Sequence, residues 1–189
     1  MQCPHETGLV NGGFEMPAPT TSENWDIYNC GTDDLAWTVE WYDGAASYGG
    51  HKRPDPAQVE IHTSGVIVGA YKGNQYAELD TDWDGPGGGL NGEPASVRIY
   101  QVLDTCPDQE YALSYAWRGR PGETSALQVT FGDYLASHSD NSGEWDIETV
   151  IATAHDWTET LDSIETGTPD SFGMFLDAVS IEKCDTCGS

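Results

Sequence analysis

Three aspartates in one short glycine-rich stretch have the spacing of cation ligands. Asp80, Asp82 and Asp84 stand two residues apart and are followed by Gly85. Oxygen ligands at alternate positions followed by a glycine form the first half of a calcium-binding loop. The glutamate that closes such a loop is absent, and Asn91 stands in its place. Because three neighbouring carboxylates repel each other unless a cation lies among them, we predict Ca²⁺ here. The alternative is a merely solvated acidic loop.

Two predicted β-strands hold this acidic loop. Residues 76–80 alternate apolar and polar side chains, and residues 97–103 are rich in β-branched and aromatic residues. Further short strands are expected at 9–15, 37–42, 59–62, 66–68, 111–118, 127–131, 148–154, 158–161 and 172–182. The polar stretches 20–34 and 137–144 are expected to be loops. No stretch has a clear helical spacing of apolar residues, so the sequence predicts an all-β antiparallel sandwich or jelly roll.

Length and charge narrow the class of protein. The 189 residues suit one domain, expected to span residues 1–189 with its core at about 9–182. The 32 acidic residues outnumber the 7 basic ones and give a net charge of −25. Nucleic acid and anionic membrane surfaces are therefore disfavoured as partners, since both require a basic face. No run approaches the roughly 20 apolar residues of a membrane helix, and residues 1–4 do not begin a signal peptide.

The five cysteines indicate an oxidising compartment. Cys184 and Cys187 form a C-x-x-C, which by itself would suggest zinc or redox chemistry. No second C-x-x-C accompanies it, so disulfides that tie down the chain ends are favoured. The expected location is extracellular or at the cell surface. The odd number leaves one cysteine free or bonded to another molecule.

Four motifs, taken in order, resemble a known superfamily. They are LVNGGFE at 9–15, QYAELD at 75–80, IYQ at 99–101 and FLDAVSI at 175–181. Their order resembles the galactose-binding-like jelly rolls, which include many carbohydrate-binding modules. The resemblance implies a β-sandwich that is usually non-catalytic and that often holds a structural calcium near its first and last strands.

The same resemblance implies that Glu15 and Asp177 share that ion. Antiparallel pairing of the terminal strands would bring the two carboxylates together, where they need a cation or a proton. Ala178 replaces the second aspartate that commonly ends the motif, which removes one ligand. The alternative is that both carboxylates face water. The same pairing would bring Cys3 toward Cys184 or Cys187, so a disulfide between the termini, with Cys3 and Cys184 as the candidates, is expected.

The sequence contains no recognisable catalytic motif. Its five histidines are scattered without metal-ligand spacing, and the glycines that follow the acidic run lack a phosphate-binding lysine. A pair of glycosidase carboxylates is not distinguishable among 32 acidic residues. We therefore expect a protein that is not an enzyme.

A sugar site is predicted from aromatic and cationic side chains. Sugars bind flat aromatic faces together with polar groups that contact their hydroxyls. The residues Trp83, Arg98, Tyr100 and Arg118 are expected to form a shallow site on one sheet face. The alternative is that the arginines neutralise nearby carboxylates. Other aromatic residues alternate with small or polar ones and are expected in the core: Trp37, Trp41, Tyr111, Tyr115 and Trp117.

Two functions are consistent with these features. The first is a non-catalytic, calcium-stabilised extracellular module that binds carbohydrate. The second is a structural subunit of a filament, sheath or surface layer, assembled from copies of itself through strand edges and calcium.

Overall fold

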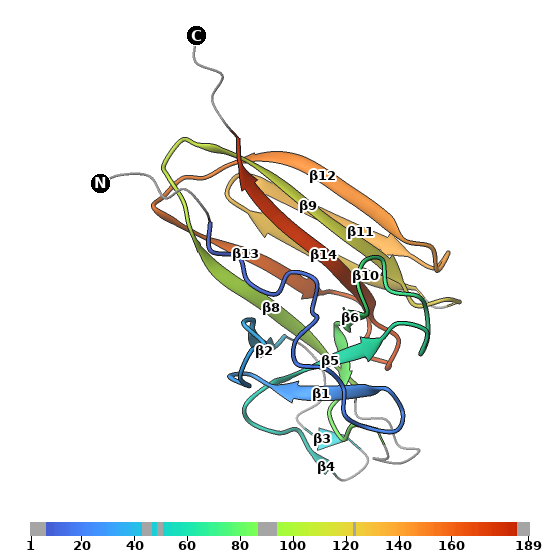
Figure 1. Ribbon diagram of the computed structural model, residues 1–189. Helices are drawn as coiled ribbons and strands as arrows, with labels where there is room; N and C mark the ends of the chain where they lie inside the picture. The colour runs from blue at the N-terminus through green and yellow to red at the C-terminus, as the bar shows by residue number, and fades with distance from the viewer. Residues whose placement is uncertain (1–6, 43–46, 49–50, 87–93, 123, 185–189) are drawn as a thin grey trace.

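Two antiparallel β-sheets pack face to face in the computed structural model, which describes residues 7–42, 47–48, 51–86, 94–122 and 124–184 (Figure 1). Sheet A contains six strands, in spatial order β1 (Trp25–Asn29), β5 (Gln58–Thr63), β6 (Gln75–Glu78), β14 (Met174–Lys183), β9 (Glu110–Gly119) and β12 (Asp146–Thr153).

Sheet B faces sheet A across the core. Its strands, in spatial order, are β11 (Tyr134–Asp140), β10 (Ser125–Phe131), β13 (Thr158–Glu165), β8 (Pro94–Asp104) and β2 (Thr38–Trp41). The short β7 (Asp80–Asp82) also pairs with β8, and β3 (Ser47–Tyr48) pairs with β4 (His51–Lys52). All strand pairings among the described residues are antiparallel. The described part of the chain contains no helix, so none there is long and apolar enough to cross a membrane.

The core lies between the two sheets and follows the two-residue period of a strand. In β10 the buried side chains Leu127, Val129 and Phe131 alternate with half-buried ones. A fully buried side chain of this size contributes roughly 2 kcal/mol to folding. Three of the five predicted core aromatics are buried, and Trp41 and Trp117 pack against the core while partly exposed. The structure thus confirms the predicted all-β antiparallel sandwich.

Several local predictions are wrong, and long-range pairing explains two of them. The polar segment 20–34, expected to be a loop, contains β1, which pairs with β5 through Trp25 and His62. The predicted turn cluster at 137–144 overlaps β11, which pairs with β10. The local preference of these segments for a strand is weak. They form strands because they pair with segments that the local composition does not reveal. Residues 66–68, predicted as a strand, lie in turns and bends.

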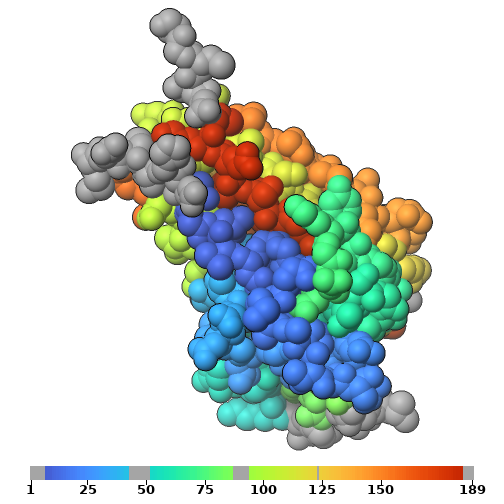
Figure 2. Space-filling view, in the orientation of Figure 1, coloured from blue at the N-terminus to red at the C-terminus, as the bar shows by residue number. Residues whose placement is uncertain are grey.

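The predicted opening strand at 9–15 is also absent, because Asn11 and Phe14 have φ angles of 53° and 55°, which interrupt an extended strand. The segment nevertheless closes the core. The Gln101 side chain donates from Nε2 to Val10 O at 2.6 Å and accepts from Val10 N at 3.1 Å. The Val179 N–H donates to Gly12 O at 2.8 Å. Figure 2 shows this N-terminal segment, in blue, lying beside the red β14.

A buried carboxylate joins the two sheets. Glu165 ends β13 in sheet B, and its Oε2 accepts the N–H of Met174, the first residue of β14 in sheet A, at 2.7 Å. Its Oε1 accepts the N–H groups of Ala126 and Gly167 at 3.1 and 3.0 Å. Burial raises the pKa of Glu165 to about 7, and these three main-chain donors act in the opposite direction. Glu165 thereby fixes the connection from β13 to β14.

Replacing Glu165 with alanine should destabilise the fold strongly. Glu165→Ala removes the acceptor of three buried or half-buried N–H groups, each of which costs about 1–3 kcal/mol when left unpaired. We expect a loss of at least roughly 3 kcal/mol in the free energy of unfolding, measured by urea denaturation. The control Glu182→Ala removes an exposed carboxylate of β14 and should change stability by less than about 0.5 kcal/mol. Equal effects of the two substitutions would contradict this role of Glu165.

Candidate functional site

The first part of the predicted acidic calcium loop is a strand. Asp80 and Asp82 lie in β7, so their side chains share one face of an extended chain, and a turn follows in which the Gly85 N–H donates to Asp82 O at 2.8 Å. Asp80 Oδ2 accepts the N–H groups of Asp170 and Ser171 at 2.6 and 2.9 Å. Asp82 Oδ1 accepts the Ser171 hydroxyl at 2.5 Å. Asp84 is exposed, and Asn91 lies outside the described residues. A cation bound by this set stays a prediction; the expected loop is a strand at Asp80–Asp82, and the expected turn at Gly85 is present.

The second predicted calcium pair comes together around one loop. Glu15 Oε1 accepts the N–H groups of Asn74 and Gln75 at 2.8 and 3.3 Å. The buried Asp177 accepts the Lys72 N–H on Oδ2 at 2.9 Å. Both carboxylates therefore hold the segment 72–75, although the strand pairing predicted to bring them together is absent.

The electrostatics of this pair favour a positive charge nearby. A Cβ added to Gly13 would lie 3.8 Å from Glu15 Cγ and 4.0 Å from Asp177 Oδ1, so both side chains border the same small volume. Burial raises the pKa of Asp177 to about 6, and the charge of Glu15 adds to this shift. The N–H donors on Asp177 oppose it. Two carboxylates in this setting gain from a proton or a cation.

The four predicted sugar-binding residues do not share one sheet face, so that arrangement is wrong. Arg98 and Tyr100 lie on β8 in sheet B, whereas Arg118 lies on β9 in sheet A. Trp83 is buried, with an exposed fraction of 5%, and packs edge-on against Trp41 at 6.1 Å between ring centroids. Arg118 is also buried, with its guanidinium 5.5 Å from the ring centroid of Trp145. Sheet membership depends on long-range pairing, which the local patterns did not contain.

Arg98 and Tyr100 form a polar cluster on the outer face of sheet B. The Arg98 guanidinium lies 4.3 Å from the centroid of the Tyr100 ring. It donates to Asp162 Oδ2 from Nε and Nη2, at 2.7 and 2.5 Å, and to Glu40 Oε2 from Nη1 at 2.8 Å. The bonds to Asp162, followed by those to Glu40, raise the pKa of Arg98 above its ordinary value. The Tyr100 hydroxyl donates to Glu40 Oε1 at 3.2 Å. The arginine thus neutralises carboxylates, as the alternative stated.

The outer faces of the two sheets differ in exposure. On sheet A, the outward side chains Tyr76, Glu78 and Phe175 are buried, because Val68, Ala70 and Trp145 pack over them. On sheet B, the outward side chains around Arg98 are half-buried or exposed: Glu40, Tyr100, Val102, Gln128, Thr130, Ser137 and Thr160. Sheet B therefore presents an open face on which hydroxyl, amide and charged groups lie beside the apolar side chains of Val102, Leu135 and Ile164.

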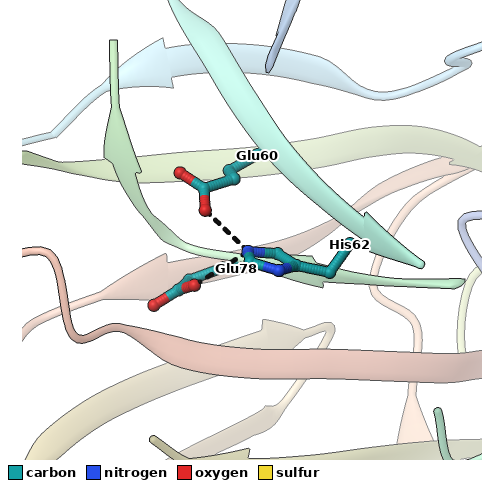
Figure 3. A group of neighbouring side chains, drawn as sticks. All are labelled: Glu60, His62 and Glu78. Carbon is teal, nitrogen blue, oxygen red and sulfur yellow. Dashed lines mark hydrogen bonds and ion pairs between the residues drawn. The ribbon is translucent and has the colours of Figure 1, made fainter. Parts of the chain in front are cut away.

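A buried cluster that the sequence did not predict lies on the outer face of sheet A. Glu60 and His62 stand two residues apart in β5, and Glu78 pairs with Glu60 in the neighbouring β6. Figure 3 shows both carboxylates pointing at one ring nitrogen, with His62 Nε2 2.6 Å from Glu60 Oε1 and 3.0 Å from Glu78 Oε2. Burial raises the pKa of Glu60 to about 7. Burial lowers the pKa of His62, but the two carboxylates outweigh it and raise it to about 9. The only local signal was the Glu-x-His spacing.

Other candidate features contribute less. A surface hollow of about 560 Å³ is lined by residues of the N-terminal segment and the chain before β2: Val10, Asn11, Met16, Asp34 and Ala36. None of the predicted site residues lines it.

Cys3 lies outside the described residues, so its predicted disulfide with Cys184 stays a prediction.

Comparisons with known proteins concern the fold. No protein-family model and no curated protein matches the chain. A solved carbohydrate-binding module, TmCBM61 in complex with β-1,4-galactotriose, is 17% identical, with a TM-score of 0.46, and the match covers 94% of this chain and 99% of that one. A family 4 carbohydrate-binding module is 13% identical, with a TM-score of 0.44, covering 94% and 100%. The arabinose-bound α-L-arabinofuranosidase MgGH51 is 13% identical, with a TM-score of 0.48, covering 95% of this chain and 26% of that one.

The class of fold follows from the topology. Two antiparallel sheets, between which the chain crosses repeatedly, form an all-β sandwich of jelly-roll type. The predicted fold class is thus confirmed, and the galactose-binding-like motif order stays a resemblance.

A substitution at Gly73 tests how closely Glu15 packs against the segment 72–75. Its φ is +73°, and a Cβ there would overlap Glu15 Oε1. Gly73→Ala should therefore cost more than the roughly 1–2 kcal/mol of a left-handed backbone alone. Gly65→Ala is the matched control, because Gly65 has a φ of +95° and nothing within 4 Å of the added atom. We expect Gly73→Ala to lower the free energy of unfolding by about 1–3 kcal/mol more than the control, measured by urea denaturation. Equal losses would show that Glu15 is not fixed against this loop.

Proposed function

We propose that the protein is a non-catalytic, extracellular carbohydrate-binding module, stabilised by calcium, that binds its ligand on the outer face of sheet B. The observation that carries this proposal is the Arg98–Tyr100 cluster on the open outer face of sheet B. Beneath that face the sandwich core is closed, so the platform is rigid. No contact among the described residues favours the filament alternative, and no second function is proposed.

The chemistry of this cluster suits a sugar. Neighbouring hydroxyls of a pyranose donate and accept hydrogen bonds, and a carboxylate beside a guanidinium offers both partners. The Glu40 side chain is 49% exposed and that of Arg98 is 30% exposed, so both remain accessible to a ligand. The ion pairs with Asp162 and Glu40 hold the guanidinium in place, which reduces the entropy lost on binding. Gln128, Thr130 and Thr160 extend the polar surface along the sheet.

Sugar binding should depend on Glu40. A screen of polysaccharides identifies a ligand, and isothermal titration with its oligosaccharide measures the affinity. We expect Glu40→Gln to weaken binding roughly tenfold, because a hydrogen bond to a charged group contributes about 1.5 kcal/mol.

The matched control is Glu182→Gln, which neutralises an exposed carboxylate on sheet A. It should bind as the unaltered protein does. Unchanged affinity in both Glu40→Gln and Arg98→Ala would place the ligand elsewhere. A failure of every glycan in the screen to bind would reject the proposed function itself.

We place the calcium ion between Glu15 and Asp177. Removing it by chelation should lower the Tm by several degrees, because a ligand bound only by the native state stabilises that state. Adding Ca²⁺ alone should restore the Tm. The difference between the calcium-loaded and calcium-free Tm should vanish in Asp177→Asn and persist in Asp84→Asn, whose aspartate is exposed. Identical melting curves with and without Ca²⁺ in the unaltered protein would reject this site.

A further inference from the structure

We propose that Glu60, His62 and Glu78 form a buried binding site for a divalent transition-metal ion, with Zn²⁺ as the best fit. This site differs in place and in ligand chemistry from the calcium site proposed at Glu15 and Asp177. It does not depend on the proposed sugar-binding function.

The sheet brings the three ligands together. Side chains two residues apart in a strand share a face, so Glu60 and His62 both leave the outer face of β5. The register of β5 and β6 places Glu78 directly opposite Glu60. All three side chains are buried, with exposed fractions of 4%, 2% and 0% in the order Glu60, His62 and Glu78. The ligands therefore lie on rigid, paired strands, which suits a preorganised metal site.

The donor atoms have the spacing of a coordination shell. One oxygen of Glu60 and one of Glu78 lie 2.6 and 3.0 Å from the same His62 Nε2. The three donor atoms all lie within 4.8 Å of one another. A single ring N–H satisfies one acceptor well and leaves the second unexplained. An ion bonded at about 2.0–2.1 Å places its tetrahedral ligands roughly 3.3 Å apart, which requires only a small expansion of this cluster.

The remaining carboxylate oxygens are already oriented by neighbouring groups. Glu60 Oε2 accepts the Asp82 N–H at 3.2 Å. Glu78 Oε1 accepts the Gly173 N–H at 2.9 Å and the Arg120 Nη1 at 3.1 Å. Such contacts orient the ligands of metal sites. One oxygen of each carboxylate is directed at His62, and that of Glu78, Oε2, also accepts a hydrogen bond from Arg120 Nη1 at 3.3 Å.

Stacked rings fix the orientation of the imidazole. The Trp25 ring lies 5.8 Å from the His62 ring at an interplanar angle of 10°, and the Tyr76 ring lies 5.3 Å away at 7°. The imidazole is therefore held between two parallel rings with Nε2 toward the carboxylates. Little rearrangement is needed before an ion binds.

The neighbourhood has a shortage of positive charge. Glu60 and Glu78 interact electrostatically with further buried or half-buried carboxyl groups, namely Asp80, Asp82 and Glu165. Among the described residues, Arg120 and His62 are the cations that act on this group. Asp80 Oδ1 is buried and has no hydrogen-bond partner in the described part of the chain. A divalent ion would supply the missing charge.

The ligand set selects the metal. Imidazole nitrogen favours zinc and its neighbours among the transition metals, while Ca²⁺ takes six to eight oxygen ligands. One nitrogen with two carboxylate oxygens, all buried, fits Zn²⁺ with three protein ligands. Because the site is buried beneath loops, the ion would join β5 to β6 and would not be open to a large substrate.

The test uses the full chain, freed of metal with a chelator and then titrated with Zn²⁺ against a chromophoric competitor. We expect one equivalent to bind and the Tm to rise. Glu60→Gln and His62→Gln should each weaken Zn²⁺ binding by at least 100-fold. The control His155→Gln removes an exposed histidine, and Asp177→Asn removes the calcium ligand. Both should bind Zn²⁺ as the unaltered protein does.

A second measurement needs no variant. X-ray absorption of the zinc-loaded protein should show four ligands in the first coordination shell at about 2.0–2.1 Å, namely one imidazole nitrogen, two carboxylate oxygens and a water oxygen. Nitrogen-15 NMR should show His62 Nε2 changing from a protonated to a metal-bound nitrogen. No binding of Zn²⁺, or binding that leaves His62 an imidazolium, would overturn the proposal in favour of a plain buried ion pair. Loss of binding in His155→Gln would assign the ion to the surface instead.

Discussion

Buried carboxylates that accept main-chain N–H groups hold this molecule together. With 32 acidic and 7 basic residues, the chain has too few cations to pair most of its acidic side chains. Its loops supply the donors instead. Glu165 binds the start of β14, Asp80 binds the segment at 170–171, and Asp177 and Glu15 bind the segment 72–75. Each such bond is charge-assisted, and is stronger than one between neutral groups. The loops that close the sandwich are therefore positioned by acidic side chains.

The two sheets differ in how their outer faces are covered and in which charged groups they carry. The outer face of sheet A is covered around β5, β6 and the start of β14, and this covered part holds the acidic clusters, including Glu60, His62 and Glu78. The outer face of sheet B is left open, and its charges are paired across neighbouring strands by Arg98. Buried carboxylates demand protons, cations or donors, whereas an exposed polar face can exchange water for a ligand. In the functions we propose, sheet A would bind ions that stabilise the sandwich, and the outer face of sheet B would bind the sugar.

The two proposed cation sites differ in their ligand atoms and would bind different ions. The pair Glu15 and Asp177 offers oxygen ligands at the loop that joins β5 to β6, beside β14. The cluster at Glu60 offers nitrogen and oxygen between β5 and β6 themselves. Hard oxygen sites and mixed imidazole sites select different ions, so the two could be filled independently. Both would act on the β5–β6 region, one at the connecting loop and one between the strands.

The sequence by itself determined the fold class, because alternating side-chain types in 76–80 and 111–118 and the β-branched and aromatic residues of 97–103 are local properties of strands. It also determined the acidic character, and a resemblance in motif order predicted that Glu15 and Asp177 lie near each other. Only the tertiary structure decided which residues share a face. Arg98 and Arg118 are twenty residues apart and lie in different sheets, and Trp83 is buried although its neighbours are acidic. His62 meets Glu78 only because β5 pairs with β6 in one register. Strand partners and register are set by contacts distant in sequence, so no local spacing could reveal them.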